Sequence, residues 1–213
     1  MGRYAGLCGV ILAAGESSRM GRDKALLPWP PQAGAFAGGT FLSAAIQLFD
    51  PFVDVVLVVA GKNQPNIAPI VYANGASLVV NSHPERGQFS SLQAGLQEVL
   101  NRGRDAAMIT LVDRPPVLPA TIQTLSDAFD EGLLQGKWAV VPAFQSKHGH
   151  PILAGRELIE AFLRATATSS ARDIEHAHLD KIVYVPVEDS LVVANVDTPE
   201  EYAHLPAPVL PTS

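Results

Sequence analysis

Five short apolar runs constrain the fold more than any other feature of this sequence. They lie at residues 7–12, 53–60, 78–80, 106–112 and 139–141. Near-continuous apolar runs of this length are typical of parallel strands that are buried on both faces. Between and after them, apolar residues at three- and four-residue spacing predict helices over residues 40–49, 90–102, 119–131 and 155–164.

The alternation of strand and helix predicts one α/β domain with a Rossmann-like, three-layer architecture. Two later apolar runs, residues 182–186 and 191–194, flank a polar turn and predict an antiparallel hairpin or edge addition, so the parallel sheet should be mixed. We expect the domain to span residues 1–204 and the proline-rich residues 205–213 to form a tail. In such folds ligands bind at the carboxyl ends of the strands.

Charge and composition exclude several classes of partner. The net charge of −6 argues against a nucleic-acid-binding surface. The apolar runs are too short to cross a bilayer, and the N-terminal residues do not resemble an export signal. Cys8 is the only cysteine, which rules out an intramolecular disulfide or a cysteine metal cluster. We therefore expect a cytoplasmic protein without a nucleic-acid or membrane partner.

The segment of residues 12–24, Leu-Ala-Ala-Gly-Glu-Ser-Ser-Arg-Met-Gly-Arg-Asp-Lys, follows the first apolar run directly. Its small residues allow the backbone to approach a nucleotide, while backbone N–H groups, Arg19 and Lys24 can meet phosphate oxygens. Its spacing is neither that of a Walker loop nor G-x-G-x-x-G. From the residues alone, a strand-to-helix turn with solvated cations explains the segment equally well.

Asp113 lies directly after the apolar run at residues 106–112, so its carboxylate should stand at the carboxyl end of a central strand. Mg²⁺ prefers oxygen ligands and commonly takes one or two protein groups together with phosphates. The alternative is that Asp113 only caps the helix that begins near Pro119.

Asn195 ends the run at residues 191–194, and Asp197 follows two residues later. On a strand the two side chains would share a face. Alternatively, Asp197 or Thr198 is the N-cap of a short helix that begins with Pro199.

The segment at residues 12–24 resembles the signature L-A-A-G-x-x-x-R-M-G-x-x-K of nucleotidyltransferases related to the molybdenum cofactor guanylyl- and cytidylyltransferases. Similar segments follow in the family's order at residues 81–92, 111–117, 149–151 and 195–202. Ala14, the Ser90-Ser91 pair and the triplet at residues 149–151 look closest to the cytidylyltransferase branch. Val112 departs from the family, which usually has Gly there, and its methyl groups could crowd the nucleotide.

This resemblance implies a fold like that of the nucleotide-diphospho-sugar transferases and a Mg²⁺-dependent transfer of a nucleoside monophosphate, with CTP favoured over GTP. The acceptor would be the phosphate of the molybdopterin cofactor, pyrophosphate would be released, and a molybdoenzyme would be a further partner. Two alternatives remain: a sugar 1-phosphate or another small phosphorylated acceptor, and a non-catalytic carrier of the molybdenum cofactor.

The resemblance also implies roles for individual residues. The expected catalytic residues are Arg19, Lys24 and Asp113, and the expected metal ligands are Asp113 and Asn195. His150 would contact the acceptor, although a histidine before proline is as often a structural hydrogen-bonding group. The expected nucleotide-binding residues are Leu12, Ala13, Ala14, Gly15, Arg19, Lys24, Asn81, Gly87 and Ser91.

Overall fold

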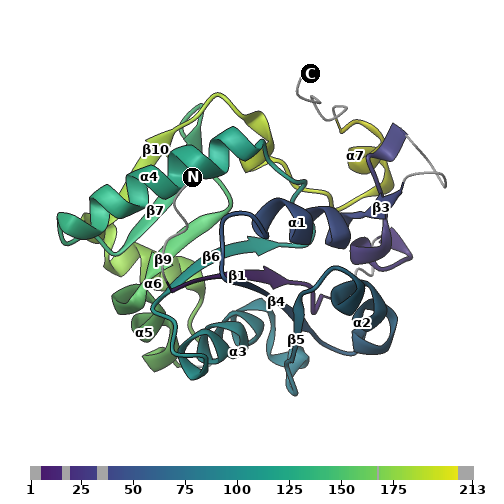
Figure 1. The fold of residues 1–213 in the computed structure, drawn as a ribbon, viewed down its shortest axis with the longest axis horizontal. Coiled ribbons are helices and arrows are strands. Elements are labelled where there is room, and N and C mark those ends of the chain that lie inside the picture. The colour runs from purple at the N-terminus through teal and green to yellow at the C-terminus, as the bar shows by residue number, and fades with distance from the viewer. Residues whose placement is uncertain (1–5, 16–19, 33–37, 167, 206–213) are drawn as a thin grey trace.

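A computed structural model of the protein describes residues 6–15, 20–32, 38–166 and 168–205. Its main sheet has the strand order β10-β7-β9-β6-β1-β4-β5, with β8 paired to β7 (Figure 1). The strands are β1 (Leu7–Leu12), β4 (Val55–Ala60), β5 (Ser77–Val80), β6 (Ala106–Leu111), β7 (Ala139–Phe144), β8 (Lys147–His148), β9 (Ile152–Gly155) and β10 (Ile182–Pro186). A separate two-stranded antiparallel sheet joins β2 (Pro28–Trp29) to β3 (Gly39–Thr40).

Helices cover both faces of the main sheet, which gives three layers (Figure 1). Buried residues of α1, α2 and α4 form one core cluster with the sheet, and those of α3 and α5 form the other. The α-helices are α1 (Phe41–Phe49), α2 (Gln64–Ala73), α3 (Gln88–Asn101), α4 (Pro119–Leu134), α5 (Arg156–Arg164), α6 (Ala171–Ala177) and α7 (Pro199–Ala203). Short 3₁₀ helices span Lys24–Leu26, Pro84–Arg86, Leu179–Lys181 and Ser190–Val193.

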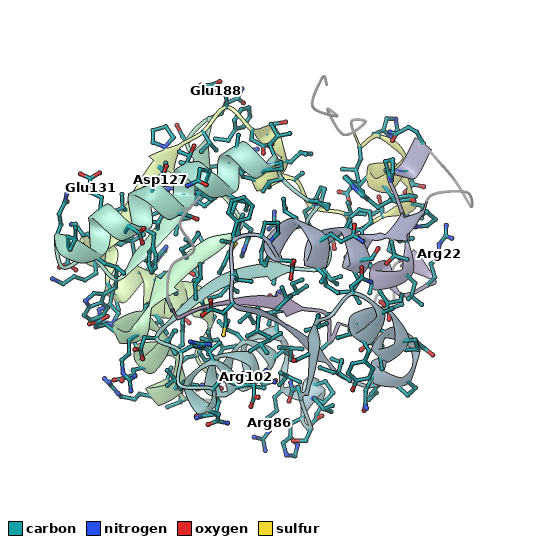
Figure 2. All side chains as sticks on the ribbon, in the orientation of Figure 1. Arg22, Arg86, Arg102, Asp127, Glu131 and Glu188 are labelled. Atoms are coloured by element: carbon teal, nitrogen blue, oxygen red, sulfur yellow. The ribbon has the colours of Figure 1, made fainter. Side chains whose placement is uncertain are left out.

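Strand β1 shows why the apolar runs are continuous. Leu7 and Ile11 belong to one core cluster, whereas Cys8, Val10 and Leu12 belong to the other. Successive side chains of a strand point to opposite faces, so a strand covered on both sides must be apolar at every position. Charged side chains such as those labelled in Figure 2 lie on the outside. The prediction of a three-layer α/β domain with a mixed, mostly parallel sheet is confirmed.

Of the two alternatives predicted for residues 182–194, the edge strand over residues 182–186 is confirmed and the hairpin is wrong. Strand β10 pairs in parallel with β7, and residues 190–193 form a 3₁₀ helix instead of a strand. The cause is Asp189, which is buried and accepts hydrogen bonds from the backbone N–H groups of Leu118 and Leu191 and from the Thr121 hydroxyl. These bonds hold the segment against the start of α4 and bury Val192 in the core.

Strand β9 and the position of Leu205 also differ from the prediction. Strand β9, antiparallel to β6 and β7, was not predicted, because four residues are too few to show a strand period. Leu205, assigned to the tail, is buried in a cluster with Val196 and Phe41. The boundary near residue 204 stays a prediction, since residues 206–213 lie outside the described residues. None of the described helices is long and apolar enough to cross a membrane.

Candidate functional site

A cleft of about 570 Å³ opens at the carboxyl ends of β1 and β6. Its walls come from the loop after β1, the loop and helix start after β5, and the turn after β6. The lining residues are Leu12, Ala14, Gly15, Lys24, Pro84, Glu85, Gly87, Gln88, Ser91, Leu111, Val112, Asp113 and Asp197. The cleft therefore lies where ligands bind in open α/β sheets.

The loop after β1 is held by backbone and side-chain hydrogen bonds. Ala13 donates its N–H to the carbonyl of Val59, while the Asn63 amide donates to the Ala13 carbonyl and to Asp23, each at 2.8 Å. Asp23 also accepts from the N–H of Ala25, which caps the 3₁₀ helix that begins at Lys24. Asn63 thus fixes the small-residue loop and the base of Lys24 relative to each other.

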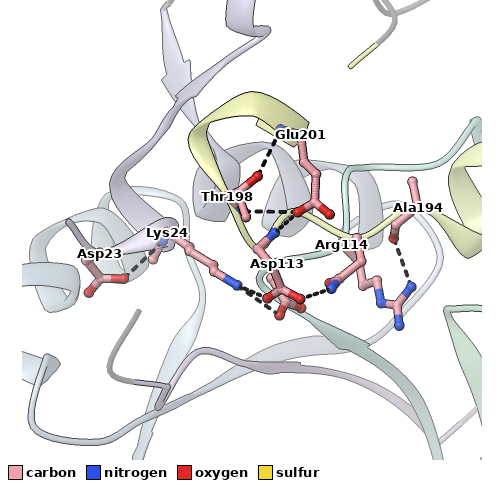
Figure 3. A network of polar contacts seen from close by, with 10 residues as sticks. Asp23, Lys24, Asp113, Arg114, Ala194, Thr198 and Glu201 are labelled. Carbon is pink, nitrogen blue, oxygen red and sulfur yellow. Dashed lines mark hydrogen bonds and ion pairs between the residues drawn. The ribbon is translucent and has the colours of Figure 1, made fainter. Parts of the chain in front are cut away.

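Lys24 lies between two carboxylates. Its Nζ is 2.7 Å from Asp197 Oδ1 and 3.4 Å from Asp113 Oδ2, and the lysine is 9% exposed (Figure 3). Asp113 comes from the turn after β6, and Asp197 from the segment before α7. This brings together one cation and two anions at the edge of the cleft.

Two oxygens beside this cluster have no partner within the described residues. Asp113 Oδ1 and Asn195 Oδ1 are both buried and accept no hydrogen bond. Asn195 donates its amide to Asp197 Oδ2 at 2.6 Å, which leaves the oxygen as its free end. An unpaired buried oxygen is costly, and carboxylate and amide oxygens are ligands that hard divalent cations prefer. The donor set therefore fits Mg²⁺ or Mn²⁺.

The contacts show whether Asp113 and Asp197 cap helices. Helix α4 begins at Pro119 with Leu118 at its N-cap, so Asp113 does not cap it. Thr198 is the N-cap of α7 in a capping box with Glu201, whose Oε2 also accepts from the N–H of Asp197. The carboxylate of Asp197 is consequently left to face Lys24 and Asn195.

The structure separates the expected nucleotide-binding residues into three groups. Leu12, Ala14, Gly15, Lys24, Gly87 and Ser91 line the cleft. Ala13 and Asn81 lie behind this surface, where Asn81 donates hydrogen bonds to the hydroxyls of Ser90 and Ser91. Arg19 lies outside the described residues. Asn81 therefore supports the loop that lines the cleft and does not line the cleft itself.

His150 does not line the cleft. Its backbone N–H donates to the Val192 carbonyl at 2.8 Å, and its Nδ1 is 3.5 Å from the carbonyl of Ile109. Burial, together with the nearby charge of Arg114, lowers the pKa of His150 to about 4, so the ring is neutral at pH 7. Next to it, a Cβ on Gly149 would lie 2.1 Å from the Val192 carbonyl oxygen, which makes glycine necessary there.

Several residues around the cleft were not singled out from the sequence. Pro84, Glu85 and Gln88 lie in the segment of residues 81–92, so their position in that loop was the available signal. Val112, which was singled out from the sequence, also lines the cleft. Asn63 gave no signal, because the helix that it precedes, α2, was not predicted.

The chain matches known nucleotidyltransferases over most of its length. It is 25% identical over 196 residues to the molybdenum cofactor cytidylyltransferase of Escherichia coli (strain K12), covering 91% of this chain and 92% of that one. It is 30% identical over 202 residues to a molybdenum cofactor guanylyltransferase of Xanthomonas euvesicatoria pv. vesicatoria (strain 85-10), covering 92% and 93%.

Solved structures share the fold of this chain. The crystal structure of Rv0371c from Mycobacterium tuberculosis H37Rv superposes with a TM-score of 0.75 at 25% identity, covering 95% of this chain and 97% of that one. A complex of the same protein with manganese gives a TM-score of 0.68 at 22% identity, covering 92% and 95%. The model of the MobA-like NTP transferase domain matches residues 9–183. With the cleft, the cation and the carboxylates in place, the chain belongs to the family of MobA-like NTP transferase domains.

Proposed function

We propose that this nucleotidyltransferase moves CMP from CTP onto the phosphate of the molybdenum cofactor and releases pyrophosphate. The observation that carries the proposal is the position of Lys24 between Asp113 and Asp197, at the edge of a cleft floored by Ala14 and Gly15. A triphosphate in this cleft would meet, at one edge, a cation for its phosphates and oxygen ligands for a metal.

On the nucleotide side, the chain supplies close approach and positive charge. A Cβ on Gly15 would meet no atom of the described residues within 4 Å, so the backbone is open toward that part of the chain. Small residues here let backbone N–H groups reach phosphate oxygens, and Lys24 stabilises the charge of the departing pyrophosphate. Arg19, which the resemblance assigns to the same role, is proposed on that ground alone.

On the metal side, Asp113 and Asn195 would hold Mg²⁺, and their unpaired oxygens support this assignment. A bound divalent cation neutralises charge on the phosphoryl oxygens and orients them for in-line displacement. Asp197 orients Asn195 through its hydrogen bond and shares Lys24 with Asp113. The chain's contribution is to keep three oxygen-bearing side chains in a fixed arrangement before the substrate arrives.

The acceptor needs no general base from the protein. The second pKa of a phosphate monoester is about 6, so at pH 7 it is largely a dianion and already a nucleophile. It attacks the α-phosphorus of CTP, a new P–O bond forms, and the bond to the β-phosphate oxygen breaks with release of pyrophosphate. The work of the residues is alignment and charge neutralisation.

The preference for CTP rests on Ala14 and on the loop before α3. Ala14 lines the cleft, at the position where the guanylyl branch usually has Gly. We propose that its methyl group leaves less room for the base. A pyrimidine is smaller than a purine, which favours cytosine. The relationship to a guanylyltransferase at 30% identity favours GTP as the second candidate.

The test is pyrophosphate release with Mg²⁺, the molybdenum cofactor as acceptor, and CTP, GTP, UTP, TTP or ATP in turn. We expect release with CTP. Release with GTP alone would assign the chain to guanylyl transfer. No release with any nucleotide, in folded protein shown to bind the cofactor, would contradict the proposal and favour a carrier, whereas release with a sugar 1-phosphate in place of the cofactor would change the acceptor.

A further inference from the structure

The segment that carries Asn195 and Asp197 has no regular structure of its own. It lies between the 3₁₀ helix at residues 190–193 and α7, and residues 194–197 form neither helix nor strand. Backbone hydrogen bonds within an element therefore do not fix these two side chains. Their position comes from contacts with other parts of the chain. Asp197 is held by Glu201 and Lys24, and the rest of the segment contacts the turn after β6.

Arg114 makes the most direct of those contacts. Its Nη1 donates to the carbonyl oxygen of Ala194 at 2.9 Å and to that of Val193 at 3.3 Å (Figure 3). One residue earlier, the Asp113 carbonyl accepts from the N–H of Val196 at 2.9 Å. The turn that supplies one oxygen ligand thus holds the segment that supplies the other.

Arg114 occupies this place at an energetic cost. Its Nε is buried without a hydrogen-bond partner among the described residues. The other buried side-chain atoms of that kind in this part of the chain are Asp113 Oδ1 and Asn195 Oδ1, so all three lie at one junction. A buried, incompletely paired cation contributes little net stability compared with an apolar side chain of the same volume. A role in fixing geometry explains the residue better than a role in stability.

We propose that Arg114 is a positioning residue that sets Asn195 and Asp197 against Asp113. The proposal rests on the metal role of Asp113 and Asn195 given under the proposed function. Arg114 does not line the cleft, so it acts through the two carbonyls that it binds. A planar guanidinium presents several donors in a fixed fork and can hold two successive carbonyls, whereas a lysine ammonium is a point charge on a flexible stem.

The first test is kinetic. In Arg114→Met we expect the Mg²⁺ concentration for half-maximal rate to rise, and kcat to fall, by about 10-fold to 100-fold, as for other groups that orient metal ligands. The KM for the nucleotide should change by less than about threefold. Arg114 does not touch the substrate, so its loss removes no contact that binds the ground state and the transition state equally. In Arg114→Lys the Mg²⁺ concentration for half-maximal rate should return part of the way to the wild-type value, because one charged donor can still reach one carbonyl.

The second test does not depend on activity or on any metal. Hydrogen exchange, followed by mass spectrometry on the free protein, should be faster in Arg114→Met for peptides covering residues 190–198 and unchanged for α3. Arg104→Met is the matched control, because Arg104 makes a surface ion pair with Asp54 at 3.3 Å before the start of β6, at the opposite end of that strand from Arg114. It should change neither the exchange at residues 190–198 nor the Mg²⁺ dependence.

Unchanged exchange at residues 190–198 in Arg114→Met overturns the proposal. Faster exchange with an unaltered Mg²⁺ requirement also overturns it, because the clamp would then be structural only. If the wild-type protein transfers no nucleotide, the proposed function fails, while the exchange experiment still reports whether Arg114 holds the segment. Faster exchange together with a raised Mg²⁺ requirement supports the positioning role.

Discussion

The two halves of the sheet are built differently. On one side, β5, β4, β1 and β6 are all parallel neighbours, and the loops that line the cleft follow the carboxyl ends of β5, β1 and β6. On the other side, β9 runs antiparallel to β6 and β7, and the segment carrying Asn195 follows a 3₁₀ helix. The first half places its cleft residues mainly at strand ends, and the second by hydrogen bonds that Arg114 donates and Asp189 accepts.

The difference teaches where the site is rigid and where it depends on individual residues. A loop that leaves a fully buried parallel strand inherits the position of the whole sheet. A segment tied by one guanidinium and one carboxylate loses its position when one of them is removed. Substitutions in the first half should therefore act on charge, and those in the second half on geometry.

The largest effect is expected for Asp113→Asn, which removes a charge from the place where the halves meet. Loss of one preorganised electrostatic contact typically costs about 100-fold to 1000-fold in kcat. Steady-state pyrophosphate release measures it. The exposed Asp127→Asn on α4 is the control and should be neutral (Figure 2). A loss below tenfold in Asp113→Asn would mean that the carboxylate is not at the reacting centre.

In the second half, His150 should make stability depend on pH. Its pKa is about 4 in the folded protein against an ordinary 6.5, so between these values the unfolded chain binds more protons. The stabilisation is complete above pH 6.5 and is lost as pH falls to 4, amounting to about 3 kcal/mol. Urea unfolding of wild type and His150→Gln at pH 7 and 4.5 measures the difference. A gap between the two proteins that stays constant with pH contradicts this.

Gly149→Ala should break the packing of the second half without touching the cleft. The added Cβ would lie 2.1 Å from the Val192 carbonyl oxygen, and backbone must move to relieve it. We expect a loss of at least about 2 kcal/mol in the free energy of unfolding, within the range for overpacking. Gly132→Ala in α4 is the control, since its Cβ would meet its nearest neighbour at 3.5 Å. If the two variants were equally stable, the Val192 carbonyl could not lie as close to Gly149 as the structure has it.

Lys24→Met tests the first half of the sheet and should have the smallest effect of these substitutions. Turnover should fall by at least about tenfold, which corresponds to 1.4 kcal/mol. Without nucleotide, however, the variant should bind Mn²⁺ more tightly, because the ammonium no longer neutralises Asp113 and Asp197. Paramagnetic resonance of free Mn²⁺ measures this, with the exposed Lys137→Met as control. Weaker Mn²⁺ binding in Lys24→Met would show that the lysine does not compete with the cation.

The sequence was most informative where a feature is local. The apolar run at residues 7–12 located β1, and the end of the fourth run was enough to predict that Asp113 lies at the carboxyl end of a central strand. The contacts of Arg114 were out of reach, because they join positions 79 and 80 residues apart and end on backbone carbonyls that carry no residue signature. The run at residues 191–194 misled because a strand and a buried 3₁₀ turn are equally apolar.

Lys24 and Asp197 form their ion pair across a separation of 173 positions in the chain. During synthesis, every cleft-lining residue from Leu12 to Asp113 leaves the ribosome well before Asp197 does. Apart from Asp197, every residue that lines the cleft lies between Leu12 and Asp113. A chain that ended between Asp113 and Asp197 would therefore lack one of the two carboxylates that contact Lys24.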